Sequence, residues 1–185
     1  RERAALGLEP SRPTLLLAAG GEGSGGLLRQ VITLCARENP WQVIVVCGRN
    51  DTVRSRILEQ KLRTPARVFG FVDNMPVLMR ASDLVIGKAG PGAIAEALAT
   101  GVPLILTTYL PGQETPNVSY VLSRGVGLYV PKAERLPGVV RRLLADDGAE
   151  LRRMARRAAG IVKPGAAVDI IDAAMQVVRR SRPAA

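Results

Sequence analysis

The sequence predicts an α/β fold in which one parallel sheet lies between two layers of helices, a Rossmann-like arrangement. Short apolar runs alternate with segments of helical periodicity along most of the chain. The runs are nearly continuous in apolar residues, which is typical of parallel strands buried on both faces. Glycine-rich turns follow two of them directly, and ligands of such sheets bind beyond the carboxyl ends of the strands.

Six short strands are expected, each bounded by turn residues. In chain order they are Thr14–Ala19, Gln42–Cys47, Arg67–Phe69, Asp83–Ile86, Pro103–Leu106 and Val126–Val130. Helices are expected between them, with polar residues at their starts or glycines at their ends. These are Leu27–Arg37, Asp51–Leu62 capped by Asp51, Met75–Ala81, the helix that carries Glu96 and ends at Gly101, Asn117–Arg124, and two or three basic helices at the C-terminal end.

The first thirteen residues are polar and contain two prolines. Such a composition before the first strand predicts a linker between domains or a segment that lies apart from the sheet. Residues 14–185 are long enough to bury a core of their own and are expected to form one domain.

The stretch Lys88–Glu96 joins an expected strand to an expected helix through a glycine turn. Backbone N–H groups and the helix dipole at such a turn favour an anion, and Gly90 and Gly92 let a phosphate approach closely. Glu96 lies one turn further along the helix, where its carboxylate would accept both hydroxyls of a ribose. The pattern predicts a nucleotide site, and the alternative is a tight turn with Glu96 in solvent.

A second glycine cluster, residues 20–26, follows the first strand and precedes a helical segment. Gly21–Gly26 matches the spacing of the dinucleotide-binding motif, but the acid expected after the next strand is absent. That strand instead leads into Cys47–Asn50, which includes Arg49. One such loop is weak evidence, whereas two in a chain of alternating strands and helices favour a nucleotide ligand.

The loop Thr107–Pro116 is rich in proline and polar residues and follows a third strand. Gln113, Glu114 and Asn117 bring two amides and a carboxylate close together, and these groups bind sugar hydroxyls through paired hydrogen bonds. The alternative is an ordinary polar loop in which Asn117 or Thr115 caps the next helix.

Composition excludes several classes of protein. The chain has no histidine, which excludes a Ser-His-Asp triad, a Cys-His pair and a histidine-bound metal within it. Cys35 and Cys47 have no metal-ligand spacing, and apolar neighbours predict buried thiols in a reducing compartment such as the cytoplasm. We expect no metal and no cofactor. No apolar run is long enough to span a bilayer, and no secretory signal is visible.

The formal net charge is +10, and basic residues concentrate between Lys132 and Arg182. Such a surface suits an anionic partner, either nucleic acid or an acidic membrane. Aromatic residues are only 3% of the chain, so platforms for base stacking are scarce and nucleic acid is the weaker choice. The alternative is a solvated arginine-rich face.

Five motifs together carry a family resemblance: Gly20–Gly23, Cys47–Asn50, Gly70–Met75, Lys88–Glu96 and Pro111–Glu114. From about Pro13 to Val178 the chain resembles the C-terminal half of the monogalactosyldiacylglycerol synthases. It is more distantly similar to the peptidoglycan N-acetylglucosaminyltransferase that acts on lipid I. Both are GT-B glycosyltransferases, which have two Rossmann-like domains facing across a cleft, and the last two motifs indicate the galactolipid branch.

The resemblance implies a domain that binds a UDP-sugar as a substrate, UDP-galactose in the first instance. It implies that the base lies against Phe71 and Val72 with Met75 nearby, that the ribose is bound by Glu96, and that Gln113, Glu114 and Asn117 contact the sugar. The diphosphate would lie on Gly90, Gly92 and Ala93 and near the loop residues Gly21, Glu22 and Gly23, with Lys88 and Arg49 as further donor-binding residues. Relatives commonly have threonine where this chain has Ala93, so one hydroxyl contact to phosphate is lost.

In the resembling family, the N-terminal domain holds the diacylglycerol acceptor and the general base. The resemblance therefore implies no catalytic base in this chain, which is either a piece of a longer protein or a separately encoded donor subunit. Residues 1–13 resemble the interdomain linker, which favours the former. The family would work at the cytoplasmic face of a membrane, as a peripheral protein.

Two other functions stay open at this point. One is a nucleotide-binding regulatory or scaffold module without transferase activity, and the other is a donor domain for glucose or N-acetylglucosamine transfer. A basic nucleic-acid binder is disfavoured by the shortage of aromatic residues.

Overall fold

The computed structural model describes residues 2–18, 26–161 and 165–180 of the chain. Its strands form one parallel sheet in the order β3-β2-β1-β4-β5-β6. The strands are β1 (Thr14–Ala18), β2 (Gln42–Val46), β3 (Ala66–Phe69), β4 (Leu84–Lys88), β5 (Leu104–Thr108) and β6 (Gly127–Tyr129). This strand order is that of the Rossmann fold, so the predicted fold class is confirmed.

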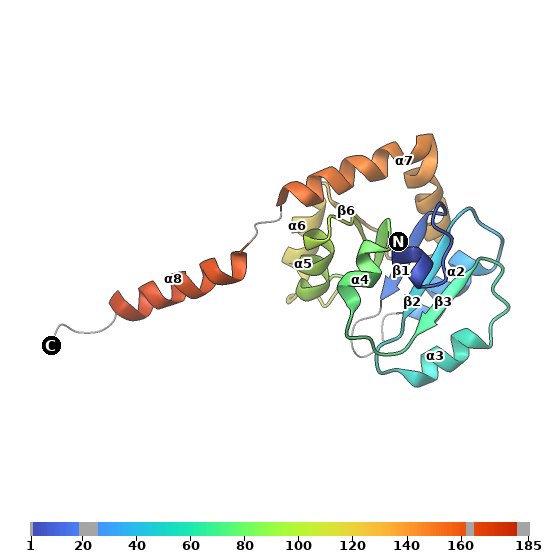
Figure 1. The fold of residues 1–185 in the computed structure, drawn as a ribbon, viewed down its shortest axis with the longest axis horizontal. Coiled ribbons are helices and arrows are strands. Elements are labelled where there is room, and N and C mark those ends of the chain that lie inside the picture. The colour runs from blue at the N-terminus through green and yellow to red at the C-terminus, as the bar shows by residue number, and fades with distance from the viewer. Residues whose placement is uncertain (1, 19–25, 162–164, 181–185) are drawn as a thin grey trace.

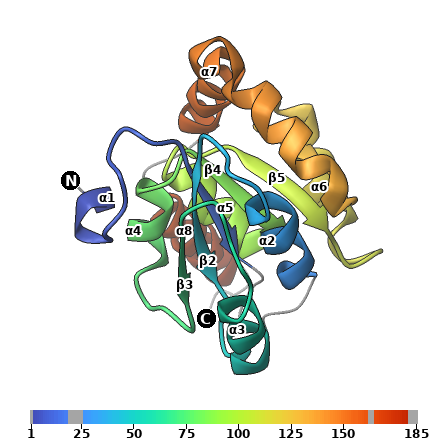
Figure 2. The same cartoon turned by 90° about the vertical axis from the view of Figure 1, so that its right-hand side faces the viewer.

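Helices follow the strands, as the apolar pattern predicts. They are α1 (Glu2–Ala5), α2 (Leu27–Cys35), α3 (Asp51–Leu58), α4 (Met75–Arg80), α5 (Pro91–Ala99), α6 (Thr115–Ser123), the 3₁₀ turn η1 (Ala133–Arg135), α7 (Leu136–Ile161) and α8 (Ala166–Arg180). Figure 2 shows α1 and α4 on one side of the sheet and α2 on the other. Helix α8 extends away from the sheet and the other helices (Figure 1).

Two apolar cores lie on the two faces of the sheet, because successive strand residues point to opposite faces. On one face α2, α3 and most of α7 pack against alternate strand residues such as Leu15 and Ile86. On the other face α4, α5 and α6 pack against the intervening residues such as Leu16 and Val85. Because both faces are covered, a ligand is expected at the carboxyl ends of the strands.

Helix α7 bends sharply at residues 145–148. The backbone of Asp146, Asp147 and Gly148 is left-handed there, with φ of 50°, 55° and 72°. The bend lets α7 contribute Leu143 to the core on one face and Ala158 to the core on the other. None of the helices in the described part of the chain is long and apolar enough to cross a bilayer.

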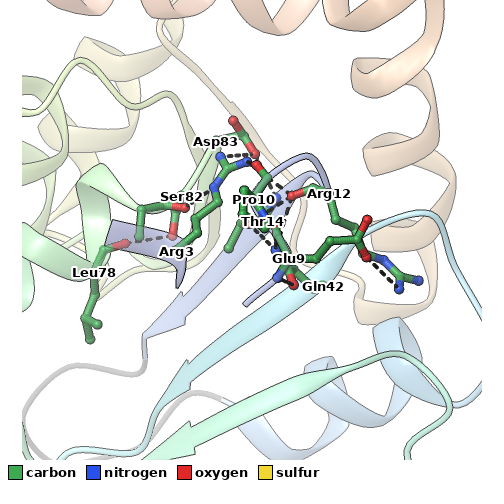
Figure 3. A network of polar contacts seen from close by, with 10 residues as sticks. Arg3, Glu9, Pro10, Arg12, Thr14, Gln42, Leu78, Ser82 and Asp83 are labelled. Atoms are coloured by element: carbon green, nitrogen blue, oxygen red, sulfur yellow. Dashed lines mark hydrogen bonds and ion pairs between the residues drawn. The ribbon is translucent and has the colours of Figure 1, made fainter. Parts of the chain in front are cut away.

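The segment before β1 packs against the sheet, so the expectation that it lies apart from the sheet is wrong. The guanidinium of Arg3 pairs with Asp83 at 2.8 Å and donates to the carbonyl of Ala81, and Leu8 is buried. The amide of Gln42 donates to the Glu9 carbonyl at 2.7 Å, as Figure 3 shows within the surrounding network. That these residues link two domains stays a prediction.

Two predicted helix details are wrong. The N-cap of α3 is Asn50, not Asp51, because the Asn50 side chain accepts the N–H of Val53 at 2.9 Å. The same helix ends at Leu58 and not near Leu62. Strand β5 also runs further than expected, to Thr108, which brings it into the predicted polar loop.

Candidate functional site

A pocket of about 340 Å³ opens at the carboxyl ends of the strands, where β1 and β4 lie side by side and the strand order reverses. Its size is within the range of ligand pockets in proteins. The lining is mostly apolar and comes from β1, β2, β4, β5, α4, α5 and the turns between them. The lining residues are Ala18, Val46, Gly48, Phe71, Val72, Met75, Met79, Val85, Gly87, Lys88, Gly90, Gly92, Ala93, Glu96, Leu104 and Leu106.

The floor of the pocket depends on a glycine in β4. A Cβ added to Gly87 would lie 2.6 Å from the backbone carbonyl oxygen of Ala18 in β1. Only glycine therefore allows the two strands to approach this closely beneath the pocket. Just after Gly87 the register between β4 and β5 shifts, since Gly87 pairs with Leu106 and Lys88 with Thr108.

The first turn of α5 forms one wall of the pocket. Gly90 is its N-cap in an extended conformation, no side chain caps the turn, and Pro91 has no N–H to donate. The N–H groups of Gly92 and Ala93 belong to this uncapped turn, where the helix geometry provides no partner. The turn therefore presents free donors and the positive end of the helix dipole to the pocket, as an anion site requires.

Glu96 lies on the same helix, at the edge of the pocket. Its side chain is exposed and forms no hydrogen bond or ion pair with the residues that the structure describes. The alternative of a solvated Glu96 holds for the chain without ligand. Glu96 lies about one helical turn beyond Gly92 and Ala93 on the same helix.

An aromatic platform closes the opposite side of the pocket. Phe71 is 61% exposed, and the guanidinium carbon of Arg49 lies 4.9 Å from the centre of its ring. Val72 and Met75 follow in the same turn and line the pocket. An exposed aromatic ring held by an arginine offers a flat face to a planar ligand. The two segments that the sequence analysis treated separately, Cys47–Asn50 and Gly70–Met75, thus form one wall.

Glu114 lies almost wholly buried at the start of α6 and binds groups of this chain. One carboxylate oxygen pairs with the Lys88 ammonium at 2.8 Å, and the other accepts the N–H of Leu110 at 2.8 Å. Burial opposes the charged form, but the hydrogen bonds from Lys88 and Leu110 and the charge of Lys88 outweigh it. They hold the pKa of Glu114 below its ordinary value.

The other residues expected to contact a sugar take different positions. Asn117 donates from its side-chain amide to the Ala89 carbonyl at 2.9 Å, so it ties α6 to the turn before α5. Glu114, not Asn117 or Thr115, occupies the N-cap position, and no side chain caps the helix. The capping alternative is therefore wrong. Gln113 is exposed in the turn before α6 and does not line the pocket.

Gly21, Glu22 and Gly23 lie outside the described residues. The structure resumes at Gly26, the left-handed N-cap of α2 with φ of 77°. A second, more open hollow begins there and extends over the ends of β5 and β6, with a volume of about 830 Å³. It is lined by Gly26, Arg29, Gln30, Thr107, Thr108, Tyr129, Pro131, Lys132, Ala133 and Glu134.

Two features of the site were not predicted from the sequence: the residues of the pocket floor and the ion pair of Lys88 with Glu114. Ala18, Val46, Val85 and Leu106 line the pocket but look like ordinary core residues in the sequence. The signal available was position at the carboxyl end of a parallel strand, and it applies only to Ala18 and Val46, the last residues of β1 and β2. Within the described residues, no group of three or more histidines, cysteines, aspartates or glutamates is placed to hold a metal ion.

Comparison with known proteins identifies the family of this chain. A profile of the glycosyltransferase family 28 C-terminal domain matches residues 15–169. The chain is 38% identical over 176 residues to the probable monogalactosyldiacylglycerol synthase 3, chloroplastic, of Oryza sativa subsp. japonica, covering 91% of the chain and 35% of the relative. It is 36% identical to monogalactosyldiacylglycerol synthase 3, chloroplastic, of Arabidopsis thaliana, covering 91% and 38%. The chain thus spans little more than a third of these relatives.

Solved structures share the fold at lower identity. MurG of Acinetobacter baumannii superposes with a TM-score of 0.73 at 18% identity, covering 95% of this chain and 53% of that one. The glycosyltransferase VinC, solved in complex with dTDP, has a TM-score of 0.68 at 20% identity, covering 96% and 44%. At these identities the likeness shows the fold alone.

Proposed function

Because this chain belongs to the glycosyltransferase family 28 C-terminal domains, we propose that it binds the nucleotide-sugar donor of a glycosyltransferase. We propose that galactose is transferred to diacylglycerol, as the name monogalactosyldiacylglycerol synthase says of the relatives, and that the donor is UDP-galactose, as the family resemblance implies. The observation that carries the proposal is the pocket between β1 and β4, which combines an uncapped helix N-terminus with a free carboxylate one turn further along.

The pocket supports a definite placement of the donor. The uracil ring lies against Phe71 and the backbone of Val72, with Met75 beside it. Glu96 accepts the ribose hydroxyls, and the N–H groups of Gly92 and Ala93 bind phosphate. The distance along α5 from Ala93 to Glu96 is one helical turn, which suits the separation between a diphosphate and the ribose that carries it.

The sugar lies beyond the diphosphate, toward the turn that carries Gln113. Within the described residues the Gln113 amide has no hydrogen-bond partner, so we propose it for sugar hydroxyls, whereas Glu114 and Asn117 already bind Lys88, Leu110 and Ala89. Gly21, Glu22 and Gly23, which lie outside the described residues, are kept as proposed donor-binding residues on the family resemblance.

Sugar transfer needs a leaving group that is stabilised and an acceptor hydroxyl that loses its proton. The N-terminus of α5 and the ammonium of Lys88 serve the first need. For the second, we propose a base from outside these 185 residues, since the chain has no histidine and Glu96 and Glu114 have other roles. Transfer then requires a further domain, and this chain alone binds donor without turning it over.

Isothermal titration calorimetry of the chain with UDP, UDP-galactose, NAD and ATP tests the proposal. We expect UDP and UDP-galactose to bind and NAD and ATP to bind far more weakly. Titrations with UDP-glucose and UDP-N-acetylglucosamine then rank the sugars. Preference for NAD or ATP would favour a nucleotide-binding module of another kind.

Transfer from radiolabelled UDP-galactose to diacylglycerol in detergent micelles tests the need for a further domain. We expect no product from this chain alone. Glu22 is the remaining acid of the glycine loop, so the same assay is run with Glu22→Gln. Product formation that disappears in this variant would identify Glu22 as a base and overturn the division of roles.

An anionic membrane surface is the proposed location, at the cytoplasmic face. The exposed arginines of α7 support it, and among them Arg153 and Arg156 have no ion pair with a described residue. Exposed arginines near an anionic surface contribute roughly 1 kcal/mol each. Vesicle cosedimentation of the chain and of Arg153→Ala/Arg156→Ala tests this, with equal binding to neutral and anionic vesicles as the contrary result.

A further inference from the structure

The ion pair between Lys88 and Glu114 joins two segments that the sequence keeps apart. Lys88 ends β4, and Glu114 begins the turn into α6. The Glu114 side chain is 3% exposed and the Lys88 side chain 33%. The carboxylate is therefore enclosed by protein, while the ammonium keeps contact with the pocket and the solvent.

Both oxygens of the Glu114 carboxylate are held. The N–H of Leu110 fixes one oxygen and the Lys88 ammonium fixes the other, each at 2.8 Å. Next to this pair, the Asn117 amide donates to the Ala89 carbonyl at 2.9 Å. The start of α6 is therefore bonded both to Lys88 and to the residue that follows it. Glu114 thus cannot turn toward a ligand without breaking its bonds to Leu110 and Lys88.

The Lys88 side chain runs beside the start of α5. Its Cε lies 3.8 Å from the point where a Cβ of Gly90 would be, and Lys88 and Gly90 both line the pocket. An ammonium has three N–H donors, and Glu114 accepts from it through one oxygen. Within the part of the chain that the structure describes, Glu114 is the one residue bonded to this ammonium, and Lys88 lines the pocket together with the uncapped turn of α5.

We propose that Glu114 is a positioning residue, which fixes the Lys88 ammonium beside the diphosphate of the donor, and that Lys88 stabilises the departing nucleoside diphosphate. This inference rests on the proposed function. A free lysine has a flexible four-carbon stem and loses much rotamer freedom when it binds phosphate. The pair with Glu114 removes that loss before the donor arrives.

The chemistry of the step explains why a fixed cation matters. The bond between the anomeric carbon and the phosphate oxygen breaks, and the oxygen keeps the electron pair, so one negative charge develops on the diphosphate. The acceptor oxygen forms the new bond to the anomeric carbon, and its proton goes to the base outside this chain. A cation already in place stabilises the developing charge without reorganisation.

The low pKa of Glu114 agrees with this role, because the carboxylate stays ionised at neutral pH. The role also differs from that of a sugar-binding residue, which would contact galactose directly. The two roles predict different outcomes for UDP, which has no sugar beyond its diphosphate.

The test compares uridine, UDP and UDP-galactose binding by calorimetry in the chain and in Glu114→Gln, Lys88→Met and the double variant. Glutamine keeps the shape of Glu114 but not its charge. We expect Glu114→Gln to weaken UDP about tenfold, the range for a hydrogen bond to a charged group, and to leave uridine unchanged. In the Lys88→Met background the same substitution should change UDP affinity no further.

Several results would overturn the inference. Loss of affinity for UDP-galactose but not for UDP would assign Glu114 to the sugar. A loss of the same size in the Lys88→Met background would mean that Glu114 does not act through Lys88. Tighter UDP binding in Glu114→Gln would mean that the Glu114 carboxylate only neutralises the Lys88 charge. If the unaltered chain binds neither uridine nor UDP, the proposed function itself fails, which is a distinct outcome.

A conservative variant keeps the test decisive if Glu114→Gln does not fold. Glu114→Asp retains the buried charge but shortens its reach to the ammonium. We expect it to weaken UDP while uridine binding is retained, and thermal unfolding followed by circular dichroism verifies that the variant is folded. Unchanged UDP affinity in a folded Glu114→Asp contradicts positioning.

Discussion

Removal of the Glu96 carboxylate should weaken nucleotide binding without weakening the fold. Glu96 is exposed, has no partner among the described residues and lies within α5, where alanine is a better helix former. Glu96→Ala should therefore keep the free energy of unfolding or raise it by a few tenths of a kcal/mol. The lost hydrogen bonds from ribose to a charged group are worth about 1.5–3 kcal/mol, which weakens UDP binding roughly tenfold to a hundredfold.

The assay is calorimetry with uridine and UDP, together with urea unfolding of the same samples. Glu38→Ala is the matched control, since it removes an exposed carboxylate away from the pocket and makes the same change in net charge. Uridine and UDP should weaken by the same factor in Glu96→Ala, because both contain the ribose. Unchanged affinities, or equal losses in the Glu38→Ala control, would refute the assignment of Glu96 to the ribose.

Three further predictions concern the fold around the site. Gly87→Ala should destabilise the chain by about 1–3 kcal/mol, because the new Cβ would lie 2.6 Å from the carbonyl oxygen of Ala18. Gly138→Ala in α7 is the control: its Cβ would meet open space, so it should stabilise the helix by up to about 1 kcal/mol. Urea unfolding measures both changes. Burial raises the pKa of Cys35 to about 12 and also raises that of Cys47, so neither thiol should react with a maleimide at neutral pH until the chain unfolds. The pKa of Glu114 is lower in the folded chain than its ordinary value of 4.5, so the ionised carboxylate stabilises the fold at pH values above 4.5. This stabilisation is lost as the pH falls through the lower pKa of the folded chain. The difference in unfolding free energy between the chain and Glu114→Gln should therefore shrink in acid.

Much of the fold was predictable because each strand is a short apolar run between polar or glycine-rich turns. Parallel strands buried on both faces leave this pattern in the sequence, and the two cores on the two faces of the sheet account for it. Helix boundaries were less predictable. Asn50 and Asp51 are both good capping residues, and the hydrogen bond from Val53 that decides between them depends on the local backbone.

The turn before α5 was predictable from its glycine and proline pattern, and it lines the pocket. The segment with Phe71, Val72 and Met75 was identified only through the family resemblance, and it also lines the pocket. The pocket floor was not predictable in this way, because Val46 and Leu106 look like ordinary core residues of buried strands. The contact between Arg49 and Phe71 also depends on the neighbouring positions of β2 and β3 in the sheet.

Glu96 and Glu114 show how environment divides two identical side chains between two tasks. Glu96 is exposed and unpartnered among the described residues, so its carboxylate is free to exchange water for ribose hydroxyls at little structural cost. Glu114 is buried and bound to Lys88 and Leu110, so moving it would leave unpaired donors behind. From the residues alone a solvated or structural role stays open for both, and the family resemblance is what implies ribose contact for Glu96 and sugar contact for Glu114. Burial separates them: the exposed acid is suited to recognition, and the buried acid to holding a cation where negative charge develops.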